Sequence, residues 1–385
     1  MEPVVFLTGG TGFIGGAVLA ELLTRHAPAR VLVLARGDEH RPAAERVQAS
    51  VARFLAPDEL GACAHRCWAL PGDVTNLVAV ADDQTGARLP IAAYPDGEVP
   101  TLADVSHVIH LAANTSFRSV RTVRRVNILG TLALAHRFRR CGGLQRFLHV
   151  GTAYICGDHS SRVIFEDDAP NDRVNYAVEY TRSKAEAEAL LAATAPELPL
   201  LIARPSVVVG HTRLGCGPSG SLFWLYRAAD LLRRYLQPLT ALEDVVPVDY
   251  VARALCALAF ATSPKHRVYH VSAGLGSSVS AAELSAAFDA HHGHRPDDPI
   301  EVTDIDRLWR ERDRLARYLG PGDEERFLQT LEIYFRFCRL TAEVFDNTRL
   351  LAEGIPAPPP FTSYLGRCVE SSRDRSVYEQ MRDDG

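Results

Sequence analysis

A threonine, a tyrosine and a lysine have the residue types and spacing needed to move a proton at a substrate oxygen. Tyr180 and Lys184 are four residues apart in a segment rich in Ala and Glu, so a helix there places both side chains on one face. A phenol titrates at about pH 10, and a nearby ammonium favours its ionised form. Thr152 follows the apolar run 146–150, where its hydroxyl can donate to the same oxygen. We predict that Thr152, Tyr180 and Lys184 form a catalytic trio.

The chain begins with a strand pattern that runs into a glycine-rich turn. The apolar residues 4–7 predict a buried strand, and a helical pattern follows the turn. Such a turn presents backbone N–H groups and the positive end of a helix dipole, which suit a pyrophosphate. The predicted contacts come from Thr8, Gly9, Thr11, Gly12, Phe13, Ile14 and Gly15. The alternative is a structural turn that holds no nucleotide.

The residues after the second apolar run, 31–34, indicate which cofactor the turn would hold. An acidic side chain at this place binds a ribose 2′-hydroxyl, whereas an arginine pairs with a 2′-phosphate. Arg36 therefore favours NADPH, and Arg46 on the next helical segment is a candidate second cation. The neighbouring Asp38 leaves NAD open, and either arginine can instead be an ordinary surface residue.

Three further segments are predicted to line the cofactor. A carboxylate after a short strand can accept from the adenine amino group or simply form a turn, small residues after a buried strand leave room for a flat ring, and a proline-to-glycine loop would flank the nicotinamide. These residues are Asp73, Val74, Leu111, Ala112, Ala113, Pro205, Ser206 and Val207. Asn127 lies in a helical run, where a buried amide needs partners, so its role is structural or that of a proton relay.

Apolar runs alternate with helical patterns over the first 275 residues, which predicts an α/β fold with a doubly wound parallel sheet of the Rossmann type. We expect residues 1–211 and 244–275 to form the NADP-binding domain. Residues 212–243 and 276–385 are expected to form a smaller, mainly helical substrate-binding lobe, with a helix over 307–318. The aromatic stretch 334–337 is either core of that lobe or an acyl-binding surface.

The bulk composition excludes several classes of function. The chain has 385 residues and a net charge of -5 with dispersed Lys and Arg, which predicts no nucleic-acid partner. Its eight cysteines lack paired spacing, so we expect free thiols and no metal site. No apolar stretch is long enough to cross a bilayer, and the first strand begins at residue 4. We expect a cytoplasmic protein without a signal peptide or transmembrane segment.

These elements resemble an extended short-chain dehydrogenase/reductase over residues 4–275, and the wording of the motifs is closest to the thioester reductase and fatty acyl-CoA reductase branch. The motifs are T-G-G-T-G-F-I-G at 8–15, L-A-R at 34–36, H-L-A-A-N-T-S-F at 110–117, V-N-I-L-G-T at 126–131, H-V-G-T-A-Y at 149–154, Y-T-R-S-K at 180–184, A-R-P-S-V-V-V-G-H-T at 203–212 and V-V-P-V-D-Y-V-A at 245–252. Thr152, Tyr180 and Lys184 match catalytic positions of that family.

The resemblance implies NADPH-dependent reduction of an acyl thioester to an aldehyde, with further reduction to an alcohol as an extension. The sequence shows no adenylation or carrier domain, so the thioester is expected in trans, as an acyl-CoA or on an acyl or peptidyl carrier protein. Two alternatives stay open. One is an extended dehydrogenase or epimerase acting on a sugar nucleotide or a steroid-like alcohol, and the other is a non-catalytic NADP-binding scaffold.

Overall fold

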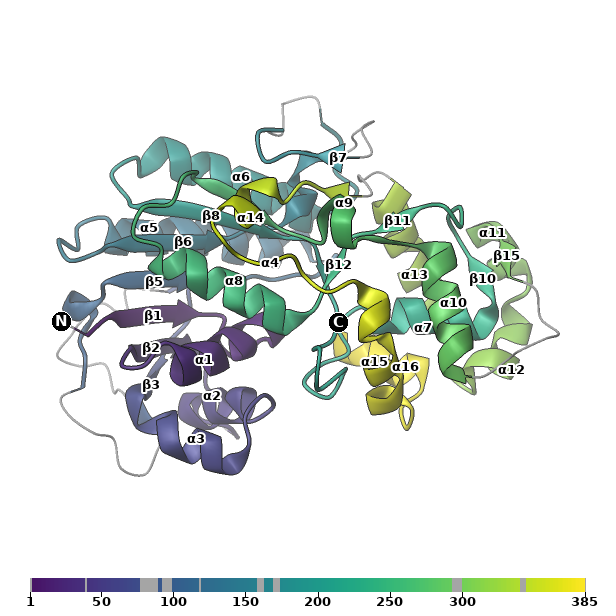
Figure 1. The fold of residues 1–385 in the computed structure, drawn as a ribbon, viewed down its shortest axis with the longest axis horizontal. Helices are drawn as coiled ribbons and strands as arrows, with labels where there is room; N and C mark the ends of the chain where they lie inside the picture. Colours follow the sequence, from purple (N-terminus) through teal and green to yellow (C-terminus); the bar gives the residue numbers. More distant parts are fainter. Residues whose placement is uncertain are drawn as a thin grey trace. The chain divides into compact units, whose positions relative to one another are not determined.

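The computed structural model describes residues 2–38, 40–76, 89–91, 99–117, 119–157, 163–168, 174–292, 300–339 and 344–384 (Figure 1). The described chain divides into two compact units. The first comprises Met1–Ile155, Glu179–Pro205 and Asp249–Tyr269, and the second comprises Cys156–Val178, Ser206–Val248 and His270–Gly385. By this division, the connection 156–178 groups with the second unit and not with the sheet that precedes it.

The first unit is built on a sheet with the strand order β13-β8-β6-β5-β1-β2-β3-β4. The strands are β1 (Val4–Thr8), β2 (Arg30–Ala35), β3 (Cys67–Pro71), β4 (Leu89–Pro90), β5 (His107–His110), β6 (Arg146–Val150), β8 (Leu200–Pro205) and β13 (Val268–Val271). The pairs from β8 across to β3 are parallel, and β4 is antiparallel to β3. The strand order reverses between β1 and β5, the place where doubly wound sheets bind ligands. This topology confirms the predicted fold class.

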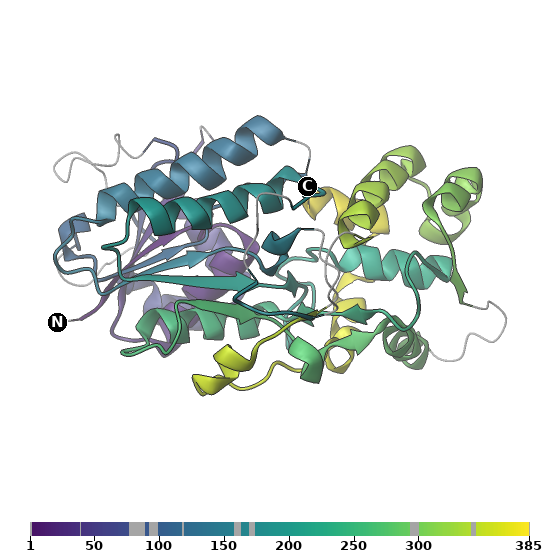
Figure 2. The ribbon, with the colours of Figure 1, turned by 90° about the horizontal axis from the view of Figure 1, so that it is seen from above.

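Helices cover both faces of this sheet (Figure 2). They are α1 (Phe13–Arg25), α2 (Ala43–Val51), α3 (Pro57–Cys63), α4 (Val120–Arg124), the π-helix η4 (Arg125–Gly130), α5 (Thr131–Phe138), α6 (Glu179–Thr194) and α8 (Val248–Phe260), with short 3-10 turns η1 (Ala64–Arg66), η3 (Leu102–Asp104) and η5 (Ala153–Cys156). Helices α5 and α6 lie on one face and α8 on the other. Alternate strand residues such as Phe6 and Phe147 are therefore fully enclosed, and they pack with Leu134 and Leu191 of the covering helices.

The second unit is mainly helical. Its helices are α7 (Phe223–Leu232), α9 (Gly274–Ser277), α10 (Ala281–His292), α11 (Ile305–Arg310), α12 (Leu315–Leu319), α13 (Glu324–Arg339), α14 (Thr348–Ala352), α15 (Leu365–Ser372) and α16 (Val377–Asp384), with 3-10 turns η6 (Arg312–Arg314) and η7 (Phe361–Ser363). The predicted helix over 307–318 is wrong as one element, because Glu311 leaves helical dihedral angles (φ -97°, ψ 10°) between α11 and α12. The Trp224 and Tyr334 rings pack edge to face at 5.6 Å, so the aromatic stretch contributes to the core of this unit.

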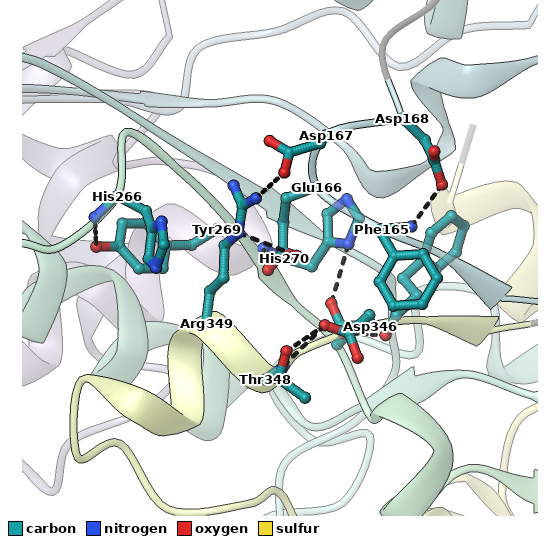
Figure 3. A network of polar contacts seen from close by, with 12 residues as sticks. Phe165, Glu166, Asp167, Asp168, His266, Tyr269, His270, Asp346, Thr348 and Arg349 are labelled. Atoms are coloured by element: carbon teal, nitrogen blue, oxygen red, sulfur yellow. Dashed lines mark hydrogen bonds and ion pairs between the residues drawn. The ribbon is translucent and has the colours of Figure 1, made fainter.

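Short strand pairs tie distant parts of the second unit together. They are β7 (Val163–Ile164) with β16 (Val344–Phe345), β9 (Val207–Val208) with β12 (Val245–Val246), β10 (Arg234–Tyr235) with β15 (Glu301–Val302), and β11 (Leu242–Glu243) with β14 (Val279–Ser280). Beside the first pair, the buried Glu166 accepts a hydrogen bond from the His270 backbone N–H at 3.3 Å and lies 3.7 Å from the Arg349 guanidinium (Figure 3). The His270 ring lies 3.0 Å from the Asp346 carbonyl oxygen. Residues 344–349 thus hold residues 163–168, which belong to the connection between β6 and α6.

Candidate active site

The glycine-rich turn joins β1 to α1 with almost no room for side chains. Gly9 has a φ of 75°, and a Cβ on it would lie 2.7 Å from the Ala112 backbone nitrogen. A Cβ on Gly15 would lie 2.0 Å from the Gly9 carbonyl oxygen. That oxygen also accepts from the Gly12 N–H at 3.0 Å, which closes the turn. The close approach of Gly9 to Ala112 packs the turn against the residues that follow β5. Larger residues at positions 9 and 15 would open it.

Helix α1 presents backbone donors at this turn. Gly12 is its N-cap, in extended conformation and without a side-chain cap. The first helical bond runs from the Gly16 N–H to the Gly12 carbonyl at 2.9 Å, so the N–H groups of Phe13, Ile14 and Gly15 have no acceptor within the helix. Together with the helix dipole, donors of this kind hold phosphate groups. The turn therefore fits the diphosphate of a dinucleotide.

Thr8 fixes the loop after β5 to the end of β1. Its hydroxyl oxygen accepts from the Ala112 N–H at 3.1 Å and lies 2.7 Å from Nδ1 of His110. The other ring nitrogen of His110 lies 2.8 Å from the Thr131 hydroxyl, which donates to the Asn127 carbonyl. Burial lowers the pKa of His110 to about 3, so the ring is neutral and can serve as donor on one side and acceptor on the other. The stretch Leu111–Ala113 is held in place by this chain of bonds.

Arg36, Arg46 and Asp73 lie together beyond the ends of β2 and β3. Arg46 donates to the Arg36 carbonyl at 2.9 Å, and the Arg36 guanidinium lies 3.9 Å from Asp73. The other Asp73 oxygen accepts from the Thr75 N–H at 2.8 Å, which is the turn-forming role. The Arg36 side chain is 68% exposed, so it is open to a ligand. Val74 differs from these charged neighbours because it is buried.

Thr152, Tyr180 and Lys184 come together in the first unit. Thr152 lies two residues beyond β6 and is hydrogen-bonded to the Tyr180 side chain. Tyr180 and Lys184 lie in the first two turns of α6, and the Lys184 ammonium donates to the Val150 carbonyl at 2.8 Å. Burial raises the pKa of Tyr180 to about 12, against the opposing effect of the Thr152 bond. Burial lowers the pKa of Lys184 to about 8.

A buried ion pair lies next to Lys184. Glu188, one turn later in α6, contacts Arg204 of β8 at 2.7 Å, and each side chain is 6% exposed. The carboxylate opposes the lowering of the Lys184 pKa, while burial raises the pKa of Glu188 itself. A Cβ on Gly151 would lie 2.3 Å from Glu188 Oε1, so the glycine after β6 makes room for the pair. The Glu188–Arg204 ion pair is not among the predicted site residues, although the spacing of four residues from Lys184 places Glu188 on the same helix face.

Asn127 holds the start of α6 from the π-helix η4. Its amide nitrogen donates to the Ser183 hydroxyl at 2.9 Å and to the Asn114 carbonyl at 3.0 Å, and its oxygen accepts from the Asn114 N–H at 2.8 Å. Ser183 donates in turn to the Tyr180 carbonyl at 2.7 Å. The Phe117 ring stacks on Tyr180 with centroids 6.3 Å apart. These bonds give the buried amide of Asn127 its partners, which is the structural role that the sequence analysis considers. A π-helical segment such as η4 often occurs at a functional site.

His149 is a further buried side chain that the sequence analysis named only within a motif. Its ring is fully buried on β6, with its centroid 5.5 Å from that of His110. Among the residues that the structure describes, neither ring nitrogen has a hydrogen-bond partner. Burial, with smaller effects of Lys184 and His110, lowers the pKa of His149 well below its ordinary value, so the imidazole is neutral. Its burial follows from strand alternation, but its lack of partners has no signal in the sequence.

The third predicted cofactor segment belongs partly to each unit. Pro205 is the last residue of β8, not a loop residue as predicted, because the chain stays extended to Ser206, whose N–H donates to the Val271 carbonyl at 3.1 Å. In the second unit, Asp244 accepts from the Phe345 and Ala273 N–H groups at 2.9 and 2.7 Å, and burial raises its pKa to about 6. Val207 pairs with Val245 of β12. Ser206 is thus held by the Val271 carbonyl and Val207 by β12.

Two kinds of feature are absent from the ranges that the structure describes. In them, no group of three or more His, Cys, Asp and Glu side chains is placed to hold a metal ion. The same ranges contain no helix with the length and apolar character required to span a membrane. The seven cysteines whose side chains are described are all free thiols.

The sequence of this chain is similar to those of known proteins. The non-canonical nonribosomal peptide synthetase FrzA of Cladobotryum sp is 27% identical over 96% of this chain and 36% of its own length. Fatty acyl-CoA reductase 1 of Xenopus laevis is 26% identical over 66% of this chain and 54% of its own. The chain therefore spans well under two thirds of the length of these curated relatives.

The fold has solved relatives as well. The terminal R domain of the myxalamid PKS-NRPS pathway superposes with a TM-score of 0.75 at 21% identity, covering 97% of this chain and 91% of that domain. A family model for NAD-binding domains, described as male sterility protein, matches residues 7–255 and so includes the turn and the trio. The resemblance predicted from the motifs is confirmed, because the relatives of this chain include a peptide synthetase and a fatty acyl-CoA reductase. The chain belongs to this male sterility protein family of NAD-binding domains.

Proposed function

We propose that this protein reduces an acyl thioester to an aldehyde with NADPH. The observation that carries the proposal is the grouping of Thr152, Tyr180 and Lys184 at the edge of the sheet that also bears the glycine-rich turn. The carboxyl ends of the parallel strands β1, β5 and β6 meet at that edge. The turn and the trio therefore lie at one edge of the sheet, where the residues of both would hold a dinucleotide.

The trio supplies the proton chemistry of the reaction. A nicotinamide cofactor, when bound, would supply the hydride for the carbonyl carbon of the thioester. Tyr180 donates its proton to the carbonyl oxygen while Thr152 hydrogen-bonds to that oxygen, giving a hemithioacetal. The Tyr180 phenolate then takes back the hydroxyl proton as the carbon–sulfur bond breaks, which releases the aldehyde and a thiolate. The thiolate takes up a proton from water, so the net reaction consumes one proton.

The electrostatics of the site suit this direction. With its pKa raised to about 12, Tyr180 carries its proton at neutral pH and can act as the acid. The Lys184 ammonium, fixed to the Val150 carbonyl, stabilises the phenolate that forms when the proton leaves. Burial strengthens that attraction because little water screens it.

Arg36 and Arg46 support NADPH as the cofactor. Arg36 directly follows β2 and Arg46 donates to its carbonyl, so both cations lie near the place where the adenosine ribose of a dinucleotide lies in this fold. Asp38, the acidic residue that would favour NAD, is engaged in its own loop, because it accepts from the His40 and Arg41 N–H groups at 2.9 and 2.7 Å. A 2′-phosphate would therefore have two cations nearby, while one oxygen of the Asp38 carboxylate is bound within its own loop.

The thioester is proposed from the relatives. Those named above are a peptide synthetase and a fatty acyl-CoA reductase, and the similarity to the synthetase and to the myxalamid R domain extends over 96% and 97% of this chain. We infer that an acyl group arrives in trans, on CoA or on an acyl or peptidyl carrier protein. The mainly helical second unit then selects the acyl chain.

The test measures NADPH oxidation by the purified protein with a panel of acyl-CoAs and acyl carrier proteins, together with trapping of the aldehyde. We expect turnover with at least one thioester and no turnover with the corresponding free acid. Absence of NADPH oxidation with every thioester would overturn the proposal. Tightly held NAD that survives purification would instead favour an epimerase acting on a sugar nucleotide.

A further inference from the structure

The end of helix α2 packs closely against the first turn of α1. Gly16, in the first turn of α1, has no side chain, and a Cβ on it would lie 2.6 Å from the Ser50 hydroxyl and 2.8 Å from the Phe54 ring. Ser50 is 3% exposed at this contact. Any larger residue at position 16 would push the two helices apart. The end of α2 and the residues after it are thereby set against the start of α1.

This packing brings Arg53 to the back of the turn. Its Nη2 atom donates to the Ser50 hydroxyl at 3.0 Å and lies 3.4 Å from the carbonyl oxygens of both Thr11 and Gly12. Its Nε atom donates to the Ser50 carbonyl at 3.4 Å. Phe54 lies beneath the guanidinium at 6.0 Å and stacks on Phe13, the first residue of α1, at 6.4 Å.

Holding the two carbonyls has a consequence for the amides. A peptide group is planar and trans, so its carbonyl and its N–H point in opposite directions. When Arg53 and the Gly16 N–H both fix the Gly12 carbonyl, the Phe13 N–H is aimed the other way, into the space that a phosphate would take. The guanidinium also adds positive charge beside the turn.

We propose that Arg53 is a positioning residue for the cofactor diphosphate, acting through the carbonyls of Thr11 and Gly12. The inference rests on the proposed dinucleotide site, but not on the acyl substrate. Arg53 would act on the diphosphate of the cofactor, whereas Arg36 would contact the 2′-phosphate. The two arginines should therefore affect different parts of the same cofactor.

The test is a comparison of ligand fragments. Dissociation constants for NADPH, NADH, ADP and adenosine 2′-monophosphate are measured by calorimetry on the full chain and on two variants. Arg53→Leu should weaken NADPH, NADH and ADP about tenfold, because all three carry a diphosphate, and should leave adenosine 2′-monophosphate within about twofold. Arg36→Ala should weaken NADPH and adenosine 2′-monophosphate and spare NADH and ADP. Arg53→Lys keeps the charge without the planar fork and should give an intermediate loss.

Two results would overturn the inference: unchanged ADP binding in Arg53→Leu, or an equal loss for ADP and adenosine 2′-monophosphate. Thermal unfolding without ligand shows whether each variant is folded, and Arg53→Gln replaces Arg53→Leu if the latter is not. If Arg36→Ala behaves as expected while Arg53→Leu has no effect, only this inference fails. If the unmodified protein binds none of the dinucleotides, the proposed function fails with it.

Discussion

The two ends of the proposed cofactor site are built in opposite ways. At the catalytic end, Thr152 and Lys184 are buried, and Lys184 is held by a 2.8 Å bond to a strand carbonyl. At the adenosine end, Arg36 is 68% exposed and its contact with Asp73 is 3.9 Å long. Proton transfer needs fixed distances and suitable pKa values, and at this end burial shifts the pKa values of both Tyr180 and Lys184. Selection of a phosphate needs only an accessible charge, so substitutions there should change affinity and spare the fold.

The largest effect is expected at the catalytic end, from Tyr180→Phe. This change removes the proton donor and keeps the ring that stacks on Phe117, so turnover should fall about 10³-fold. Steady-state NADPH oxidation with the best acyl thioester measures the loss. NADPH affinity and the unfolding temperature should stay near those of the unmodified protein. Turnover that survives the change would remove Tyr180 from the mechanism.

Glu188→Gln should have the next largest effect, and on stability. It leaves the Arg204 guanidinium buried without a counter-charge, which should cost about 3 kcal/mol in the free energy of unfolding. Urea unfolding followed by circular dichroism measures this cost. Glu186→Gln is the matched control on the same helix: its 2.9 Å ion pair with Arg124 is partly exposed, so about 0.5 kcal/mol is expected. Equal losses in both variants would contradict the contrast between buried and exposed charges.

The trio, the turn and the buried ion pair differ in how far the sequence predicts them. The sequence predicts that Tyr180 and Lys184 share a helix face, because this depends only on their spacing within one helix. It predicts the glycine-rich turn because the glycines directly follow a strand pattern. The ion pair of Glu188 with Arg204 joins α6 to β8, and the contact of Arg53 with Thr11 joins the residues after α2 to the turn before α1. Both depend on how separate elements pack, which no local spacing records. That the His149 ring nitrogens find no hydrogen-bond partner among the described residues depends on packing in the same way.

At the adenosine end, Arg36→Ala should weaken NADPH binding about thirtyfold and NADH binding by less than threefold, because only NADPH loses a charge-assisted pair. Fluorescence titration of both cofactors measures the ratio. The turnover rate at saturating NADPH should not change. Arg25→Ala, which removes a similarly exposed cation at the far end of α1, is the control and should alter neither affinity. Equal weakening of NADPH and NADH would show that Arg36 does not contact a 2′-phosphate.

The smallest effect expected is a pH dependence that belongs to the catalytic end alone. Burial lowers the pKa of Lys184 to about 8, so the ammonium is present below that pH and is lost above it. The maximal rate should be level below pH 8 and fall about tenfold by pH 9, while the NADPH to NADH affinity ratio set by Arg36 stays constant. Tyr180, with a pKa raised to about 12, keeps its proton over this range and cannot cause the fall.

Unfolding cannot cause the fall either, because the contribution of Lys184 to stability has the opposite sign. The pKa is lower in the folded protein than in the unfolded chain, so the cost of burying the ammonium is present in full below pH 8 and is relieved as the pH rises from there. Rate and stability should therefore diverge across this range in the unmodified protein. A Lys184→Met variant should lose both dependences, which its pH profiles of residual rate and unfolding temperature would show. A rate that falls in parallel with the unfolding temperature would assign the pH dependence to the fold and not to Lys184.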